Sequence, residues 1–345
     1  MIRLNNDYCH AAHPNILKAI AETNLEAYPG YGLDPWCEKA RSMIRTKIQQ
    51  PNAAVHFLVG GTQANYTVVS AALRPWQSVI CADSAHLNDH ETGAVEHAGF
   101  KCETTHAENG KITAQQIGEI AAAYRNSCVQ EHITQPKMVY ISFATETGTV
   151  YSLEELQAIR QVCDEFDLYL FVDGARMGYG LEAIGGNVTA QDMAEIADVF
   201  YFGGTKQGAL FGEAVVITND ELKPFFRSNI KQNGGMLAKG WLLGLQFATL
   251  FENDLYFDLA RKANEQAAKI SKALIDKGLR LASESNTNQV FVLLSEEQNE
   301  ALADKFALED EGMCGPLRKV RVCTSWSTTD EEVSAIVKAI KELPC

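Results

Sequence analysis

The sequence of 345 residues predicts an α/β fold, in which a mainly parallel sheet with helices on both faces is followed by a smaller C-terminal α+β domain. Two observations predict it. From residue 52 to about 218, short apolar runs alternate with longer amphipathic segments, as in parallel sheets whose strands are joined by helices. After about residue 218 this alternation ends, and a long helical stretch over 235–276 leads into a different pattern.

The first part of the chain supplies the strands and helices of the expected sheet. Strands are predicted, in order, at 55–59, 78–82, 100–104, 138–143 and 168–173. Helices are predicted between them at 62–73, 88–98, 113–125 and 153–166. Ligands of open parallel sheets bind beyond the carboxyl ends of the strands. Residues that directly follow strands are therefore the first candidates for a functional site.

The last part of the chain reads as the small α+β domain. Strands are predicted at 288–294 and 319–324, and helices at 296–308 and 330–343. Neither an internal repeat nor a Pro-, Gly- or Ser-rich linker separates this part from the first, so the long helical stretch is the expected connector.

Composition excludes several classes of protein. With 46% hydrophobic and 21% charged residues, the chain matches a globular protein and not a disordered or collagen-like one. Its net charge of -14 argues against nucleic acid or an anionic membrane as a partner. Nine cysteines without a C-x-x-C pair predict reduced thiols in a cytoplasmic protein. The start of the sequence lacks a signal peptide, and no apolar run reaches the length of a membrane span.

Two charged residues follow predicted strands. Asp173 ends the strand 168–173 and precedes Gly-Ala-Arg, although an aspartate there can simply cap the next turn. Lys206 lies in a Gly- and Thr-rich loop between two apolar strands, close to Phe202 and Phe211. A loop lysine is usually solvated, but apolar neighbours indicate partial burial, which lowers the pKa of a lysine toward the nucleophilic range.

Gly60-Gly61-Thr62 forms the junction between the first predicted strand and the first helix. Free amides at such a helix start can bind an anion, although a tight turn explains the same residues. The motif is neither a P-loop nor G-x-G-x-x-G. Together with Asp173 and Lys206, in this order on an α/β scaffold, it describes a pyridoxal phosphate site. The lysine would form the Schiff base, the aspartate would keep the pyridine nitrogen protonated, and the helix start would hold the phosphate.

Motifs spread over nearly the whole chain resemble those of the threonine aldolase-like, β-eliminating lyase family of fold type I pyridoxal phosphate enzymes. The matching segments are YGLDP (31–35), FLVGGTQAN (57–65), SAH (84–86) with Glu91, VDGAR (172–176), GGTK (203–206), NGGM (233–236) and VRVCTSW (320–326). The resemblance implies a fold type I aminotransferase-like fold and pyridoxal 5'-phosphate as the cofactor.

The resemblance also assigns roles around the cofactor. Lys206, His86 and Asp173 are implied to be catalytic, with His86 stacked on the cofactor ring. The residues implied to bind the cofactor are Gly61, Thr62, His86, Asp173, Arg176 and Lys206.

Five residues are implied to contact the substrate. Arg176 and Arg321 match arginines that hold the substrate carboxylate, a task that suits the planar guanidinium. Tyr31 resembles a residue supplied across a dimer interface. Asn6 replaces the usual serine near the start of the chain, and Glu146 stands where the aldolases commonly place a histidine, so both are expected to affect the choice of substrate.

The resemblance implies a carbon-carbon lyase that cleaves a β-hydroxy amino acid such as threonine to glycine and an aldehyde. A β-elimination, or another pyridoxal phosphate reaction on a different small amino acid, is the alternative. Shared active sites imply a homodimer or homotetramer. The expected domains are 1–250, which binds the cofactor, and 251–345, with residues 1–25 packing on the small domain.

Two other classes of function remain open at this stage. His86 and His90 have the i, i+4 spacing that directs two histidines at one metal on a helix, which would suit a metallohydrolase. The sequence there is neither H-E-x-x-H nor H-x-x-E-H. A binding protein on the same fold that has lost its activity is the third class, and the presence of Lys206 argues against it.

Overall fold

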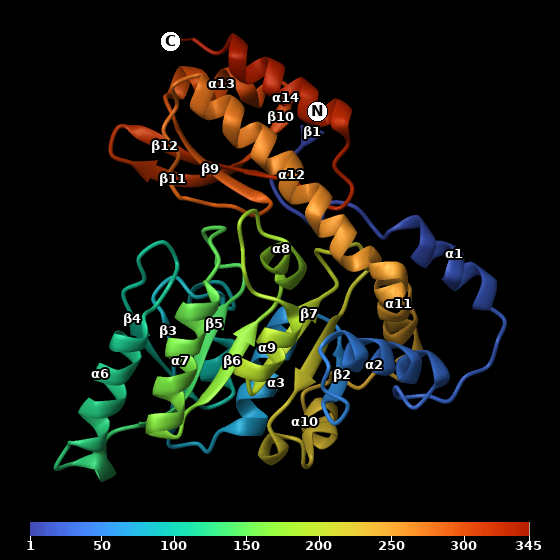
Figure 1. Cartoon of the computed structure of the whole chain (residues 1–345), viewed down its shortest axis with the longest axis vertical. Coiled ribbons are helices and arrows are strands. Elements are labelled where there is room, and N and C mark those ends of the chain that lie inside the picture. Colours follow the sequence, from blue (N-terminus) through green and yellow to red (C-terminus); the bar gives the residue numbers. More distant parts are fainter. Residues whose placement is uncertain (345) are drawn as a thin grey trace.

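A computed structural model describes residues 1–344. Its centre is a seven-stranded sheet with the order β2-β8-β7-β6-β5-β3-β4 (Figure 1). Strand β8 runs antiparallel to both of its neighbours, and the other pairings in this sheet are parallel. The strands are β2 (Ala54–Leu58), β3 (Gln77–Ala82), β4 (Lys101–Thr105), β5 (Gln135–Ser142), β6 (Tyr169–Asp173), β7 (Val199–Gly203) and β8 (Glu213–Ile217). The predicted, mainly parallel sheet is confirmed.

Helices cover both faces of this sheet, with α7 and α9 in front and α3 behind in Figure 1. The helices in this part of the chain are α3 (Gly61–Ala72), α6 (Ala114–Arg125), α7 (Leu153–Phe166), α8 (Met177–Leu181), α9 (Ala190–Ile196) and α10 (Phe226–Gln232). Helix α7 has the predicted bounds because its ends are marked locally. Ser152 and Glu155 form a capping box at its start, and Asp167 ends it in the left-handed conformation.

Two predicted helices are interrupted in the structure. The predicted helix 88–98 is replaced by the single turns α4 (His86–Asp89) and α5 (Ala94–His97), because Gly93 between them has a φ of 70°. The predicted stretch 235–276 divides into α11 (Trp241–Phe251) and α12 (Leu255–Asp276). Asn253 and Asp254, with φ of 53° and 58°, stop the first helix before the second begins.

The C-terminal unit, at the top of Figure 1, contains a second, antiparallel sheet with the order β11-β12-β9. Its elements are β9 (Gln289–Leu294), α13 (Glu296–Ala303), β10 (Phe306–Ala307), β11 (Glu309–Cys314), β12 (Leu317–Cys323) and α14 (Asp330–Glu342). The predicted smaller α+β unit is confirmed. The predicted helix 296–308 is too long, since α13 ends at Ala303 and β10 follows within the predicted range. Strand β11 was not predicted, because its mostly polar and exposed residues show no apolar alternation.

The N-terminal segment joins the C-terminal unit. Strand β1 (Ile2–Arg3) pairs in parallel with β10, and Leu4 belongs to the hydrophobic core of that unit. The helices that follow, α1 (Pro14–Thr23) and α2 (Pro35–Lys47), were not predicted. Residues 1–344 also contain three short 3₁₀ turns, at Gln130–His132, Asp220–Leu222 and Glu252–Asp254.

Helix α12 takes part in two hydrophobic cores. Tyr256 and Leu259 near its start pack in the core around the large sheet, whereas Ile270 and Leu274 pack in the core of the C-terminal unit. The cores thus meet along one helix, and the domain boundary at residue 250 stays a prediction.

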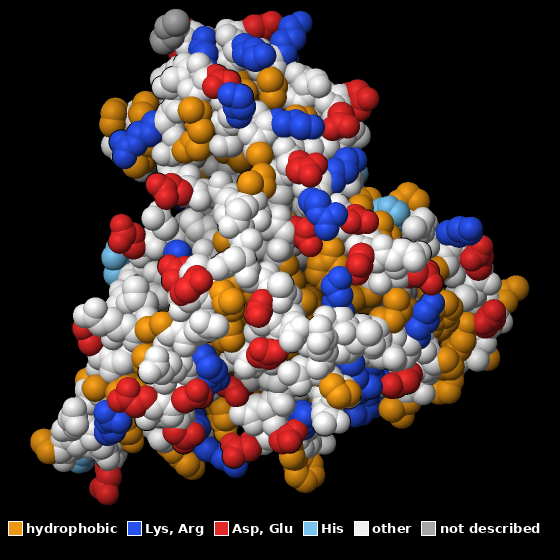
Figure 2. Space-filling model, viewed as in Figure 1, with side chains coloured by type: hydrophobic (Ala, Val, Ile, Leu, Met, Phe, Trp, Pro, Cys, Tyr) orange, Lys and Arg blue, Asp and Glu red, His pale blue; other side chains and the backbone are white. Residues whose placement is uncertain are grey.

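On the face drawn in Figure 2, Lys and Arg side chains are interspersed with Asp and Glu side chains. Within the described part of the chain, no helix is both long and apolar enough to cross a bilayer. The eight cysteines among residues 1–344 are free thiols.

Candidate active site

A cavity of about 240 Å³ lies beyond the carboxyl ends of β2, β6 and β7. Five predicted site residues line it together: Gly61, Thr62, His86, Asp173 and Lys206. The remaining lining residues are Val59, Gly60, Ala175, Tyr201, Thr205, Phe211 and Glu213. Residues far apart in the sequence are thus brought to one place, where open α/β sheets bind ligands.

One wall of the cavity is the start of α3. Gly60 precedes the helix in an extended conformation without a side-chain cap, and the first helical bond runs from the Ala64 amide to the Gly60 carbonyl. Of the residues that the structure describes, none accepts a hydrogen bond from the amides of Gly61 or Thr62. These donors and the helix dipole suit a phosphate group.

Asp173 is buried at the end of β6. Its Oδ2 accepts hydrogen bonds from Tyr140 Oη at 2.5 Å and Asn65 Nδ2 at 3.0 Å, and its Oδ1 accepts one from the Ala175 amide at 2.9 Å. Burial alone would raise the pKa of this carboxyl, but the electrostatic effect of His86 and the hydrogen bonds from Tyr140 and the Ala175 amide keep the pKa below its ordinary value. The side chain is therefore a fixed, ionised carboxylate.

Lys206 lies in the loop between β7 and β8. Tyr179 Oη donates a hydrogen bond to the Lys206 carbonyl oxygen at 2.7 Å, which fixes the backbone there. Burial, assisted by the charge of Arg176, lowers the pKa of the amine, and the carboxylates of Asp7 and Asp173 oppose that shift. A lowered pKa increases the fraction of neutral, nucleophilic amine.

Glu213 is a buried acid in the cavity wall that the sequence did not reveal. Its Oε1 lies 2.8 Å from Thr205 Oγ1, and its Oε2 accepts a hydrogen bond from the Gly204 amide at 3.2 Å. Burial raises the pKa of this carboxyl to about 8, although Thr205 and Lys206 act in the opposite direction. The only signal for Glu213 in the sequence is its position as an acid at the start of an apolar strand. Acids at strand ends are common, so this position does not identify a site residue.

The imidazole ring of His86 is held by the carboxylate of Glu91. Glu91 Oε1 lies 2.9 Å from His86 Nδ1 and accepts a hydrogen bond from Asn65 Nδ2 at 2.7 Å. Because the same Asn65 nitrogen donates to Asp173, one buried network joins the histidine to the strand-end aspartate. Asn65 and Tyr140 were not predicted as site residues. Tyr140 is a polar side chain within the apolar run 138–141, a signal that could have revealed it, whereas Asn65 is one of several polar residues in α3 and had no such signal.

Glu146 contacts the histidine segment. Its Oε1 accepts hydrogen bonds from the His86 amide at 3.0 Å and from Ser142 Oγ at 2.6 Å. Burial raises the pKa of this carboxyl, and the hydrogen bond from Ser142 opposes that shift. The side chain does not line the cavity, so its contact with a substrate stays a prediction.

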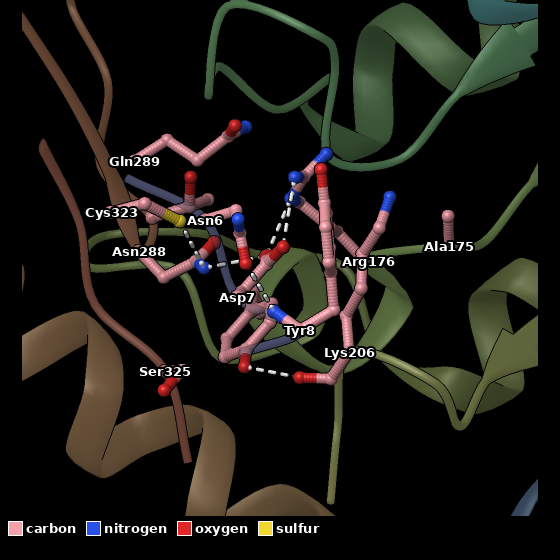
Figure 3. A network of polar contacts seen from close by, with 12 residues as sticks. Asn6, Asp7, Tyr8, Ala175, Arg176, Lys206, Asn288, Gln289, Cys323 and Ser325 are labelled. Carbon is pink, nitrogen blue, oxygen red and sulfur yellow. Dashed lines mark hydrogen bonds and ion pairs between the residues drawn. The ribbon is translucent and has the colours of Figure 1, made fainter. Parts of the chain in front are cut away.

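Arg176 is paired with an acid from the N-terminal segment, as Figure 3 shows. Its Nε and Nη2 donate to Asp7 Oδ2 and Oδ1 at 2.8 and 3.0 Å. Asn288 Nδ2 donates to Asp7 Oδ2 at 2.9 Å. Burial alone would raise the pKa of Asp7, but the charges of Arg176 and Lys206 hold it below its ordinary value. Asp7 was not predicted as a site residue.

Arg321 and Asn6 lie on the same side of the site as Asp7. Arg321 Nη2 donates to the Asn5 carbonyl oxygen at 3.2 Å, and its Nη1 lies 3.3 Å from Glu311 Oε1. Asn6 Oδ1 accepts a hydrogen bond from the Tyr8 amide at 3.0 Å. Arg321 and Asn6 do not line the cavity, so their contact with a substrate also stays a prediction.

Tyr31 lies outside the cavity of its own chain. It has a φ of 61°, its side chain is half exposed, and Lys231 Nζ lies 5.2 Å from its ring centre. A role in the site of another subunit stays a prediction.

The two histidines of the metallohydrolase alternative do not gain further ligands. Among residues 1–344, no three His, Cys, Asp or Glu side chains form a group that could hold a metal ion. His86 is bonded to Glu91, and His90 Nε2 lies 3.8 Å from its exposed neighbour Asp89.

The residues of the cavity fit pyridoxal phosphate. The free amides of α3 suit its phosphate, the ionised Asp173 suits its pyridine nitrogen, and Lys206 suits its aldehyde. The buried Tyr201 hydroxyl also lines the cavity and has no hydrogen-bond partner within the described residues, so it is available to a ligand. A Cβ atom on Gly61 would stand 3.3 Å from that hydroxyl, tighter than most such contacts, so glycine keeps this wall open.

Comparison with known proteins gives one consistent family. The sequence pattern of the family described as beta-eliminating lyase matches residues 7–297. A low specificity L-threonine aldolase of Pseudomonas aeruginosa is 31% identical over 335 residues, which cover 95% of this chain and 94% of that protein.

Solved structures point to the same family as the sequence comparison. The threonine aldolase of Leishmania major superimposes with a TM-score of 0.96 at 41% identity, and 99% of each chain is covered. An aspartate aminotransferase of Thermus thermophilus superimposes with a TM-score of 0.70 at 16% identity, over 99% of this chain and 91% of that one. This second likeness concerns the fold alone, and it confirms the predicted fold type I aminotransferase-like architecture.

Proposed function

The chain belongs to the β-eliminating lyase family, and from this membership we propose that it is a pyridoxal phosphate-dependent, threonine aldolase-like lyase. The reaction would cleave a β-hydroxy amino acid such as threonine to glycine and an aldehyde. The observation that carries the proposal is that Lys206, Asp173 and the free start of α3 share one cavity.

Six residues would hold the cofactor. Gly61 and Thr62 would bind its phosphate, Lys206 would attach it covalently, Asp173 would pair with the pyridine nitrogen, and His86 and Arg176 would flank it. When bound, pyridoxal phosphate supplies an electron sink that makes bonds at Cα of an amino acid cleavable.

The chain's own residues would bind the substrate and move one proton. Arg176 and Arg321 carry the positive charge that a substrate carboxylate requires. Cleavage of the Cα–Cβ bond removes the proton of the β-hydroxyl, and His86 would accept it. Because Glu91 accepts a hydrogen bond, Nδ1 of His86 carries a proton and Nε2 is the nitrogen left to act as the base.

Several finer points belong to the same proposal. The protein would be a homodimer or homotetramer in which the half-exposed Tyr31 reaches the site of a partner, while Asn6 and Glu146 would tune the choice of substrate. Residues 1–250 and 251–345 would be its domains. A cytoplasmic location remains a prediction from the cysteine content.

A spectral titration tests the proposal. The purified protein should absorb in the visible range when supplied with pyridoxal phosphate, and the spectrum should change on addition of glycine. Incubation with threonine, allo-threonine and serine should then release glycine together with the matching aldehyde. Release of ammonia and an α-keto acid instead would support the alternative, β-elimination, and absence of cofactor binding would refute both.

A further inference from the structure

We propose that Asp7 is a positioning residue for the substrate carboxylate: it fixes one edge of the Arg176 guanidinium and leaves the other edge for the ligand. The inference rests on the proposed function, because it needs a substrate that carries a carboxylate. It assigns a role to a residue that sequence reasoning did not select.

The ion pair uses one particular edge of the guanidinium. Asp7 Oδ2 accepts from Nε at 2.8 Å and Asp7 Oδ1 accepts from Nη2 at 3.0 Å, so both bonds lie on the side edge. A guanidinium has five N–H donors in one plane. Nη1 and the second hydrogen of Nη2 have no acceptor among residues 1–344. These donors form the end edge, which matches a second carboxylate.

The acid itself is firmly held. The side chain of Asp7 is completely buried, whereas that of Arg176 is 12% exposed. Asn288 Nδ2 donates to Asp7 Oδ2 at 2.9 Å and to the Thr324 carbonyl oxygen at 2.8 Å, which ties the acid to the C-terminal unit. A buried charge with three hydrogen bonds has little freedom, so it can define the orientation of its partner.

The same short segment also holds the second arginine. The carbonyl oxygen of Asn5, two residues before Asp7, accepts a hydrogen bond from Arg321 Nη2 at 3.2 Å. Leu4 anchors the segment, since its amide bonds to the Ala307 carbonyl and its carbonyl accepts from the Cys323 amide. Residues 5–7 therefore fix the positions of two arginines, Arg176 and Arg321, that come from different parts of the chain. A segment that only connected the two domains would not need these contacts.

Asp7 could instead compete with a substrate for Arg176. Competition requires that both carboxylates use the same donors, but Asp7 occupies the side edge only. The geometry therefore favours positioning. The two alternatives predict opposite results when Asp7 is replaced. If Asp7 positions Arg176, the protein should bind the substrate carboxylate more weakly. If Asp7 competes with the substrate for Arg176, the protein should bind that carboxylate more tightly.

The test compares two ligands that differ only in the carboxylate. Parent protein and Asp7→Asn, both supplied with pyridoxal phosphate, are titrated with glycine and with methylamine while the visible absorbance is recorded. Positioning predicts that the Kd for glycine rises about 10-fold or more in Asp7→Asn, as when one partner of a buried charge pair is lost. The Kd for methylamine should stay within about twofold, because methylamine makes no use of Arg176.

Asp198→Asn is the matched control. Asp198 also accepts from an arginine, Arg160 Nη1, at 2.8 Å, but Asp198 precedes β7 and thus lies at the end of that strand opposite to the cavity. Both variants should lose thermal stability, and only Asp7→Asn should change the ratio of the two Kd values. If Asp7→Asn does not fold, Asp7→Glu keeps the charge and displaces the carboxylate by one methylene, so the ratio should shift in the same direction.

An unchanged ratio in the folded variant, or tighter binding of glycine, would overturn the inference. A parent protein that takes up no cofactor or does not respond to glycine would overturn the proposed function, and with it the inference. If the parent protein responds to glycine and Asp7→Asn shows the same ratio of the two Kd values as the parent, only the role of Asp7 would be overturned.

Discussion

Glu91 and His86 form a carboxylate–imidazole pair, with 2.9 Å between Glu91 Oε1 and His86 Nδ1. The glutamate side chain is fully buried, whereas the histidine side chain is 38% exposed. A carboxylate in this position selects the tautomer of the ring and fixes its orientation. The pair therefore determines which nitrogen of the histidine faces the cavity.

Glu91→Ala should reduce kcat/KM for threonine by about 10- to 100-fold, as for other groups that orient a functional histidine. Cofactor binding, followed by absorbance, should be retained. Glu91→Gln keeps an oxygen that can accept from His86 and Asn65, so its loss should be smaller. Asp83→Asn is the control, because Asp83 pairs with His106 at the same distance of 2.9 Å outside the cavity. Parent activity in Glu91→Ala would rule out the orienting role.

Lys206→Ala should lose the visible absorbance of the bound cofactor and nearly all activity, since no other lysine lines the described cavity. Borohydride treatment of the parent protein should attach the cofactor irreversibly to the peptide that contains Lys206, as read by mass spectrometry. Attachment to a different lysine would contradict the assignment.

Asp173→Asn should retain some cofactor but lose about 10²-fold or more in kcat, because a neutral amide cannot stabilise a protonated pyridine nitrogen. The cause is the loss of a buried negative charge and not of volume, since aspartate and asparagine have nearly the same shape. Turnover of threonine is the measurement, and near-normal turnover would show that Asp173 does not pair with the ring.

Glu146→Ala should change the relative rates with threonine, allo-threonine and serine more than it changes cofactor binding, because Glu146 is proposed to tune the choice of substrate and its carboxylate holds the amide of His86. Ser142→Ala removes one of the two hydrogen bonds to Glu146 and should have a smaller effect. An unchanged ranking, with all three substrates slowed by a similar factor, would instead show that Glu146 acts only through the position of His86.

Glu213→Gln should become more stable relative to the parent as the pH rises from about 5 to 8. The raised pKa of Glu213, about 8, means that the folded protein keeps a proton that the unfolded chain has already lost above its ordinary pKa of 4.5. The parent therefore loses stability from this group across that window, and the uncharged glutamine does not. Melting temperatures of both proteins without cofactor, compared at each pH, check this. A difference independent of pH would contradict it.

The sequence was sufficient to predict those site residues that lie next to a recognisable strand or helix. Asp173 ends a strand that its own apolar residues identify, and the Gly61-Thr62 motif and Lys206 come shortly after two others, so the strand pattern pointed to the cavity. Helix α7 was equally predictable because Ser152 and Asp167 mark its ends.

The remainder depends on contacts between distant segments. Asp7 and Arg176 are 169 positions apart, and nothing in the residues around either one specifies the other. Glu213 is the single polar residue of an apolar strand, and Asn65 is one of several polar residues in α3, so only burial distinguishes these two from surface residues. The interruption of the predicted helix 88–98 depends on the left-handed backbone at Gly93, a residue that a helix can also tolerate.

Helix α12 couples the C-terminal unit rigidly to the large sheet. A helix of 22 residues whose two halves are built into different cores resists bending in its middle, because each hydrogen-bonded turn would have to open. A rotation at the non-helical turn before it would also be costly, because it would pull Tyr256 and Leu259 out of the core around the large sheet. A change in the orientation of the C-terminal unit, which carries Arg321, would therefore require a core to repack.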